Sequence, residues 1–187
     1  MLHKLISLDV QLFVYLNGLG SESYDGLWLF ITKQINWIPL FLLLLYIIFK
    51  KLGAKQTLYV LLSIAILILI TDQCTNLFKY NVQRLRPCNN PDIKTIIRIV
   101  QSRSSFSFFS GHAANSMASA VFIYHLIKPY FKYTFLLFLW PLIFAYSRIY
   151  LGLHYPLDIL CGYLFGMLTG FSAFKVYQFT QIKYFPL

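Results

Sequence analysis

The chain has 187 residues, of which 58% are hydrophobic and only 12% are charged. A soluble domain usually carries roughly 25% charged residues, so a membrane protein is predicted, and disorder or a secreted disulfide scaffold is excluded. The length, residues 1–187, fits one domain that crosses a bilayer about five times. Sixteen Lys and Arg against six Asp and Glu give a net charge of +10. This excess favours anionic lipid or phosphate as the partner, and no nucleic-acid partner is predicted.

The N-terminal residues, up to about Gly20, carry a short amphipathic pattern. Asp9 and Gln11 are expected on one face of a helix, and apolar residues recur at helical spacing on the other face. Because the stretch is too short to cross a bilayer, we expect this helix to lie in the membrane interface. The apolar residues are Leu5, Leu8, Leu12, Phe13 and Leu16.

Five longer apolar runs follow, each long enough to cross a bilayer as a helix. The predicted spans are residues 24–49, 56–78, 110–128, 131–150 and 155–179. The segment between the second and third spans, residues 79–107, is too polar and basic to lie in lipid. The sequence therefore predicts an all-α membrane bundle of about five transmembrane helices, preceded by the interfacial helix.

Alternation of these spans sorts the connections onto two sides of the membrane. One side receives lysines with no acidic residue among them: Lys50, Lys51, Lys55, Lys128, Lys132 and Lys183. By the positive-inside rule this side is the cytoplasm. The other side receives the N-terminal helix, residues 79–107 and the turn at 149–154. We therefore expect the active face to lie outside the cytoplasm, in a bacterial inner membrane.

Three clusters of polar residues fall at span ends on this second side. They are Lys79 with Arg86 and Pro87, then Ser110, Gly111 and His112, and finally Ser147 and Arg148 followed by His154 and Asp158. These clusters are far apart in the sequence. The order of the predicted spans places all three on the same side of the membrane, and this assignment does not depend on the identity of the cluster residues. Their convergence, within residues 79–158, predicts a functional site there.

The first set of these residues suits a phosphate group. Arg86 and Arg148 can each bind phosphate oxygens through a planar guanidinium fork, and Lys79 adds a point charge. Gly111 allows the backbone to approach closely. If Ser110 caps the third helix, the exposed N–H groups beside it form an anion site. Together these five residues predict a binding site for the phosphate of a substrate.

The remaining residues suit phosphate-ester hydrolysis. His154 and Asp158 are four residues apart, so the carboxylate can accept the ring N–H, fix the tautomer and stabilise the positive ring. His154 is the expected nucleophile, forming a phosphohistidine, and His112 the expected acid for the leaving oxygen. No metal and no cofactor are predicted, because carboxylates that could hold magnesium are scarce and the histidines suit these roles better than zinc ligation.

These motifs resemble the three signatures of the type 2 phosphatidic acid phosphatase superfamily. The resemblance covers Lys79 to Pro87, Ser110 to His112 and Ser147 to Asp158. It implies a helical bundle, metal-independent dephosphorylation through a phosphohistidine, and the same roles for the residues named above. One position departs from the family pattern, because Phe109 stands where a proline usually precedes the Ser-Gly-His triplet.

Several other charged residues are left open. Four cations could either steer the substrate or attract anionic lipid: Arg84, Lys94, Arg98 and Arg103. Asp72 and Gln73 lie inside the second span, where a charge is expensive. A structural role is favoured for this pair, with Lys33 or the site itself as the partner.

Undecaprenyl diphosphate is the substrate that we favour from the sequence, because a small chain with an outward site resembles the compact carrier-lipid phosphatases of the superfamily. Phosphatidylglycerol phosphate, phosphatidic acid and lipid A fit the same chemistry, as does a phosphotransferase with an acceptor other than water. The non-enzyme alternative is a carrier of anions or lipid phosphates, which would explain Lys79, Arg86 and Arg148. A carrier would not explain His154 with Asp158 at catalytic spacing.

Overall fold

The computed structural model describes residues 2–184, so Met1 and residues 185–187 of the predicted domain lie outside the described residues. The described residues form helices and no strand, which confirms the all-α prediction. The helices are α1 (Leu2–Gly18), α2 (Asp25–Ile31), α3 (Ile38–Val82), α4 (Gly111–Ile127), α5 (Leu139–Tyr150) and α6 (Pro156–Tyr184). Short 3-10 turns cover Glu22–Tyr24, Gln34–Trp37, Pro87–Asn89 and Thr134–Phe138.

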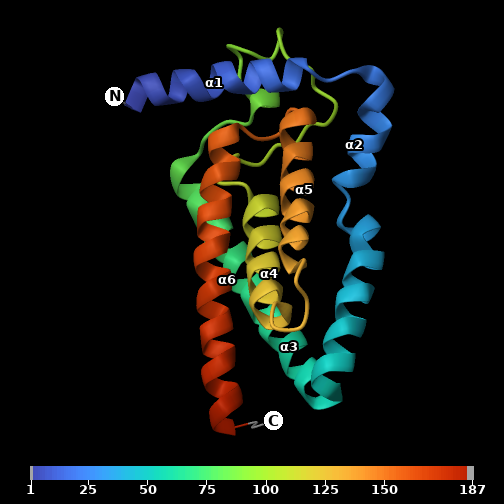
Figure 1. Ribbon diagram of the computed structural model, residues 1–187. Coiled ribbons are helices and arrows are strands. Elements are labelled where there is room, and N and C mark those ends of the chain that lie inside the picture. The colour runs from blue at the N-terminus through green and yellow to red at the C-terminus, as the bar shows by residue number, and fades with distance from the viewer. Residues whose placement is uncertain (1, 185–187) are drawn as a thin grey trace.

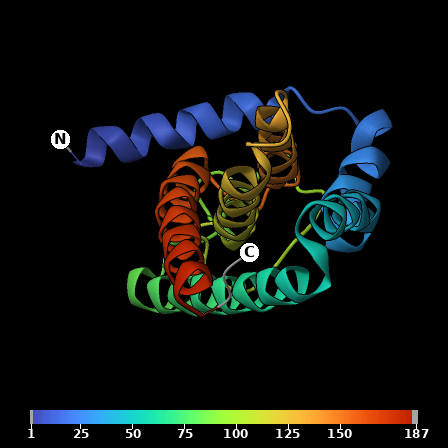
Figure 2. The ribbon, with the colours of Figure 1, turned by 60° about the horizontal axis from the view of Figure 1, so that its bottom comes forward.

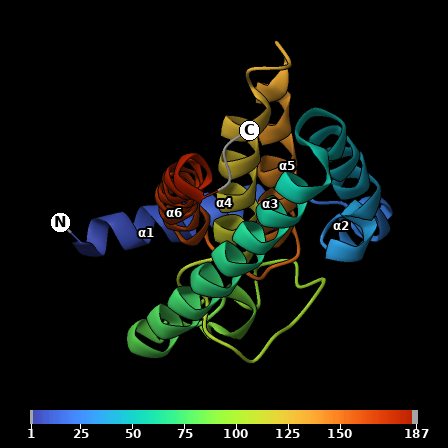
Figure 3. The same ribbon diagram turned by 90° about the horizontal axis from the view of Figure 1, so that it is seen from below.

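Helix α3 is bent into two arms at Gly53. This glycine has φ +78° and ψ 171°, a conformation that L-residues with a side chain rarely adopt. The chain therefore reverses at the far end of the bundle, and the two arms diverge from the bend in a V (Figures 1 and 3). The predicted boundary between the first two spans lies at this bend.

Two segments of the described chain are long and apolar enough to cross a membrane. They are Gln34–Asn89, which contains both arms of α3, and Pro156–Lys183. Thr134–Tyr150 is a shorter apolar helix, and α4 has 17 residues, fewer than the roughly 20 of a full crossing. Apolar spans are therefore present, whereas the total of five crossings stays a prediction.

Helix α4 lies in the middle of the bundle and packs against α3, α5 and α6 (Figure 2). Its contact with α6 is closest where glycines recur every fourth residue. A Cβ atom on Gly166 would lie 2.5 Å from the carbonyl oxygen of Ala114, and one on Gly170 would lie 2.4 Å from that of Ala118. The absence of side chains lets the two backbones touch, as small residues do between membrane helices.

Helix α1 lies across the end of the bundle where α3, α5 and the polar segment also end (Figure 1). Its orientation corrects the predicted amphipathic pattern. Asp9 is only 7% exposed and lies on the protein-facing side together with the buried Phe13, whereas Leu8 and Leu12 are exposed. The expected separation of Asp9 from the apolar contact face is therefore wrong, because Asp9 finds charged and amide partners inside the protein.

The segment between α3 and α4 is held over the same end by backbone hydrogen bonds. Cys88 N–H donates to the carbonyl oxygen of Gly152 at 3.1 Å, and Gln101 N–H donates to that of Leu151 at 3.2 Å. The buried side chain of Asn17 in α1 accepts from the N–H of Arg98 at 2.8 Å. This polar segment and α1 therefore close the end of the bundle around the turn between α5 and α6.

Candidate active site

The three motifs meet at this closed end of the bundle. Ser110 N–H donates to the carbonyl oxygen of Asp158 at 3.0 Å, which joins the second motif to the third. Arg86 Nη1 lies 2.9 Å from His154 Nε2, which joins the first to the third. Lys79 Nζ lies 3.8 Å from the point that a Cβ atom on Gly111 would occupy. The convergence expected from topology is therefore present in the geometry.

His154 lies on the turn between α5 and α6 and is only 1% exposed. Its pKa is lowered well below the ordinary value of 6.5, first because burial penalises the charged ring, and then because Arg86, Arg148 and Lys79 repel a proton. The imidazole is therefore neutral at neutral pH. Since the guanidinium of Arg86 can only donate, Nε2 is the acceptor and Nδ1 carries the hydrogen. This tautomer leaves a lone pair on Nε2.

The carboxylate of Asp158 faces the other ring nitrogen of His154. Its Oδ2 lies 3.5 Å from His154 Nδ1 and accepts the N–H of Tyr155 at 2.9 Å. Its Oδ1 accepts from Arg84 Nη1 at 2.7 Å. Asp158 is fully buried, so these donors replace the water that it lacks and fix the plane of its carboxylate.

The two arginines of the motifs differ in how far their donors are used. Arg86 is held by the carbonyl oxygen of Ser105, by that of Leu153 and by His154. Arg148 is also buried, but its Nη1 donates to Thr32 Oγ1 at 2.5 Å and its Nε has no partner among the described residues. Arg148 therefore keeps buried donors that a phosphate oxygen can use.

Ser110 caps the first turn of α4, as expected. Its Oγ accepts from the N–H of Ala113 at 3.4 Å, and its own conformation is extended. The next residue, Gly111, has no side chain between its backbone and Lys79 Nζ. This helix start therefore combines the positive end of the helix dipole with an ammonium group, and both favour an anion.

The ring of His112 stacks on Phe144 of α5, with the ring centroids 5.1 Å apart and the planes 24° apart. This contact holds the ring to one side of the first turn of α4. Phe109, at the position where the family pattern has proline, packs between Phe78 and Phe165, with centroid distances of 5.3 and 5.0 Å. Phe109, which stands in place of the usual proline, therefore packs against both α3 and α6 and connects the loop to these helices.

Other residues of the site were missed or left open by the sequence. Thr32 and Ser105 bind the two arginines, and no pattern around either residue indicates this. The sequence leaves two roles open for Arg84, substrate steering and attraction of anionic lipid, and the structure pairs it with Asp9 and Asp158. Asp72 accepts from the side chain of Asn76 at 3.2 Å and makes no ion pair with Lys33 in the described part of the chain, so that proposed partner is wrong.

A family model described as the PAP2 superfamily matches residues 56–182, well over half of the chain. The chain belongs to the PAP2 superfamily. This membership confirms the family resemblance of the three motifs, and all of the residues from Lys79 to Asp158 lie within the match. It also makes this PAP2 protein a lipid phosphate hydrolase, in agreement with the relatives that follow.

Two relatives cover nearly the whole chain. A lipid A 4′-phosphatase of Bacteroides thetaiotaomicron is 36% identical over 182 residues, which are 95% of this chain and 79% of the relative. An undecaprenyl-diphosphatase of Sulfolobus acidocaldarius is 30% identical over 182 residues, 95% of this chain and 82% of the relative. This PAP2 protein is therefore similar to enzymes named for two different lipid phosphates.

Two solved structures share the fold. The PAP2 type phosphatidylglycerolphosphate phosphatase of Bacillus subtilis gives a TM-score of 0.73 at 20% identity, covering 98% of this chain and 90% of that one. Aquifex aeolicus LpxE gives 0.62 at 23% identity, covering 90% and 95%. At these identities the likeness shows the fold alone, and the first of the two is a transmembrane protein.

Replacing Arg148 by Lys keeps the charge but removes the fork that can bind two phosphate oxygens. We expect kcat/KM for a lipid phosphate to fall roughly 10²-fold, the usual effect of losing one preorganised donor. The measurement is the release of inorganic phosphate by the purified protein in detergent. Lys94→Ala, which removes an exposed cation of the segment between α3 and α4, is the control. Unchanged kcat/KM in Arg148→Lys would show that only the charge matters at this position, and an equal loss in Lys94→Ala would show that the effect is not specific to Arg148.

Proposed function

We propose that this PAP2 protein removes the 4′-phosphate from lipid A. The main support is the 36% identity, over 95% of the chain, to a lipid A 4′-phosphatase. A second protein of that name, from Porphyromonas gingivalis, is 28% identical over 96% of the chain. Undecaprenyl diphosphate, preferred from the sequence, is less well supported. It remains the second candidate because of the Sulfolobus acidocaldarius relative.

In the proposed mechanism His154 Nε2 attacks the phosphorus of the bound phosphate. Arg86 Nη1, which now donates to this nitrogen at 2.9 Å, transfers its hydrogen bond to a phosphate oxygen and frees the lone pair. Arg148, Lys79 and the N–H groups at the start of α4 neutralise the non-bridging oxygens.

The bond between phosphorus and the sugar oxygen breaks as the bond to Nε2 forms, and His112 donates its proton to the departing oxygen. Asp158 stabilises the positive ring of the phosphohistidine through Nδ1. Water then attacks the phosphorus and gives a proton to His112. Cleavage of the phosphorus–nitrogen bond releases inorganic phosphate and restores neutral His154, so the enzyme returns to its starting state without a metal ion.

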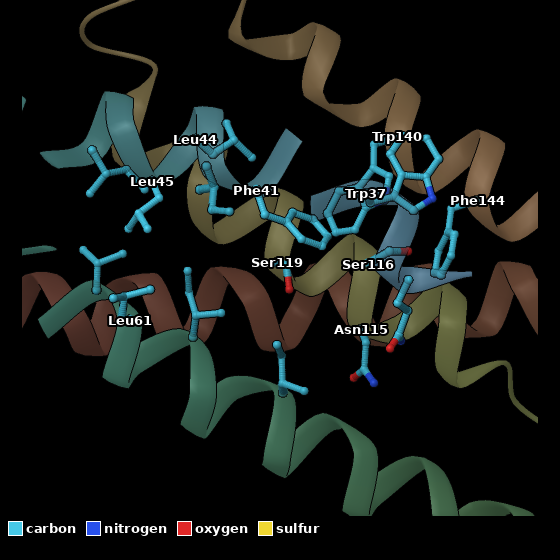
Figure 4. A pocket seen from close by; sticks show the side chains of 16 residues that line it. Trp37, Phe41, Leu44, Leu45, Leu61, Asn115, Ser116, Ser119, Trp140 and Phe144 are labelled. Atoms are coloured by element: carbon cyan, nitrogen blue, oxygen red, sulfur yellow. The ribbon is translucent and has the colours of Figure 1, made fainter. Parts of the chain in front are cut away.

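An apolar cavity below the site supports a lipid as the carrier of the phosphate. It has a volume of about 310 Å³ and lies between the arms of α3, α4 and α5 (Figure 4). Phe144, on which His112 stacks, is part of its wall. The other wall residues include Trp37, Phe41, Leu61, Ser119 and Trp140. We propose that one acyl chain of the lipid occupies this cavity while its phosphate lies at His154.

We further propose that five helical passes cross the bilayer and that the site opens outside the cytoplasm, in a bacterial inner membrane. The support is the distribution of charge over the bundle. Lys50 and Lys51 lie beside the bend at Gly53 in α3, and this bend is at the end of the bundle opposite the turn between α5 and α6 (Figure 1). The positive-inside rule assigns that end to the cytoplasm.

The substrate is tested with a panel of lipid phosphates in detergent, measuring phosphate release with and without EDTA. The panel contains lipid A bisphosphate, undecaprenyl diphosphate, phosphatidylglycerol phosphate and phosphatidic acid. We expect lipid A to give the highest kcat/KM, EDTA to have no effect, and His154→Ala to release no phosphate while remaining folded. Fastest turnover of another lipid would reject lipid A as substrate, and an active His154→Ala protein would reject the mechanism.

The proposed binding of an acyl chain in the apolar cavity is tested by filling the cavity with a larger side chain. Ser119→Phe places a ring in the cavity and should raise KM for the preferred lipid several-fold, because the acyl chain loses its space, while hydrolysis of p-nitrophenyl phosphate stays unchanged. Leu62→Phe adds a ring at an exposed position of α3 outside the cavity and serves as the control. If Ser119→Phe leaves KM for the lipid unchanged, the acyl chain lies elsewhere.

Orientation is tested by labelling single cysteines with an impermeant maleimide in cells with a permeabilised outer membrane. The natural thiols of Cys74, Cys88 and Cys161 are first replaced by Ser. Ser104→Cys, at an exposed position near the site, should label in intact cells, and Ala54→Cys, exposed beside the bend, only after lysis. The opposite pattern would place the site in the cytoplasm and leave the phosphatase chemistry standing.

A further inference from the structure

A series of contacts between charged side chains connects helix α1 to the proposed nucleophile. Asp9 of α1 accepts from Arg84 Nη2 at 2.6 Å, through its Oδ2. The other terminal nitrogen of Arg84, Nη1, donates to Asp158 Oδ1 at 2.7 Å. Asp158 in turn faces His154 Nδ1. One guanidinium group is therefore shared by two buried carboxylates, and the second of these touches the histidine.

Further contacts hold this chain of groups in one geometry. The second oxygen of Asp9, Oδ1, accepts the N–H of Leu157 at 2.8 Å, which satisfies a free donor in the first turn of α6. The guanidinium of Arg84 lies over the ring of Tyr155, 3.9 Å from its centroid, and the edge of Phe13 packs on that ring at 5.3 Å. Helix α1 thus contacts the start of α6 through both a polar and an aromatic residue.

We propose that Asp9 and Arg84 are positioning residues for catalysis, and that α1 is therefore a functional part of the active site. Arg84 fixes the plane of the Asp158 carboxylate, so that Oδ2 faces His154 Nδ1. Asp9 holds Arg84 in place and shares its charge. The proposal rests on the proposed role of His154 as the nucleophile.

The charges explain why two carboxylates and one cation are needed. A buried carboxylate without a partner is costly, so Asp158 requires the guanidinium of Arg84. If Arg84 paired with Asp158 alone, its positive charge would offset the negative charge of Asp158. The carboxylate would then stabilise the positive ring of the phosphohistidine less. Asp9 takes up part of the positive charge of Arg84. The carboxylate of Asp158 is therefore buried and paired, and its Oδ2 remains available to the ring.

The test compares kcat and KM of Asp9→Asn, Arg84→Gln and the double variant, using the panel lipid that the wild-type protein hydrolyses fastest. Asn keeps an acceptor for the Leu157 N–H, so the start of α6 is preserved. We expect kcat to fall roughly 10- to 100-fold in each single variant, as for other partners of an active-site histidine, with little change in KM. The double variant should be no slower than Arg84→Gln, because the residues act as one unit.

Asp25→Asn is the matched control. It breaks the pair of Asp25 with Arg98, 2.8 Å apart, which also joins two segments at this end but has no contact with Asp158 or His154. Wild-type kcat in Asp9→Asn, a loss as large in Asp25→Asn, or a further loss in the double variant would overturn the proposal. If Asp9→Asn fails to fold, Arg84→Lys replaces it, since an ammonium lacks the planar fork whose two terminal nitrogens reach the two carboxylates. Wild-type kcat in Arg84→Lys would overturn the proposal equally.

These outcomes are distinct from failure of the proposed function. If the wild-type protein and His154→Ala release phosphate at the same rate, the mechanism itself fails. If His154→Ala is inactive and Asp9→Asn is fully active, the function stands and only the role of α1 is rejected.

Discussion

Close contact between the backbones of α4 and α6 is the constraint on which the site depends. Gly162, Gly166 and Gly170 remove the side chains that would separate these helices. At the top of the same contact, Ser110 N–H reaches the carbonyl oxygen of Asp158. The start of α4, which we propose binds phosphate, and the carboxylate in the first turn of α6 thus lie beside each other. A wider spacing would separate the proposed phosphate-binding groups from the proposed nucleophile.

A second constraint is the removal of many charges from water. Arg86, Arg148, His154 and Asp158 are all buried, and such groups are stable only with partners. The partners come from distant parts of the chain, such as Thr32 beside α2 and Arg84 after α3, and Arg84 is itself paired with Asp9 of α1. The site is therefore organised before a substrate binds, which reduces the reorganisation needed during the reaction. The free Nε of Arg148 is an exception that suits a ligand.

The polar site and the apolar cavity meet at one aromatic residue. Phe144 supports the ring of His112 and also forms part of the cavity wall. A lipid with its phosphate at His154 and a chain in the cavity would therefore contact both faces of this region. This arrangement relates the substrate class to the architecture of the bundle, because the arms of α3, joined at Gly53, enclose the space that the chain would fill.

The sequence by itself determined the class of the fold and the family of lipid phosphate hydrolases. Apolar runs require helices in a membrane, and the motif residues carry chemical groups whose phosphate affinity needs no structure to recognise. Topology alone placed the motifs on one face, because each motif lies at the end of a predicted span.

The tertiary structure decided which groups meet across long stretches of chain. Asp9 and Arg84 are 75 residues apart, and helical periodicity assigned Asp9 to the wrong face because periodicity reports polarity and not the presence of a buried partner. Thr32 and Arg148 are 116 residues apart, and a threonine carries no local signal of the arginine that it binds. Such pairings form only when α1, α2 and the segment after α3 pack over the end of the bundle. That packing is set by long-range contacts among these elements, which the local sequence does not encode.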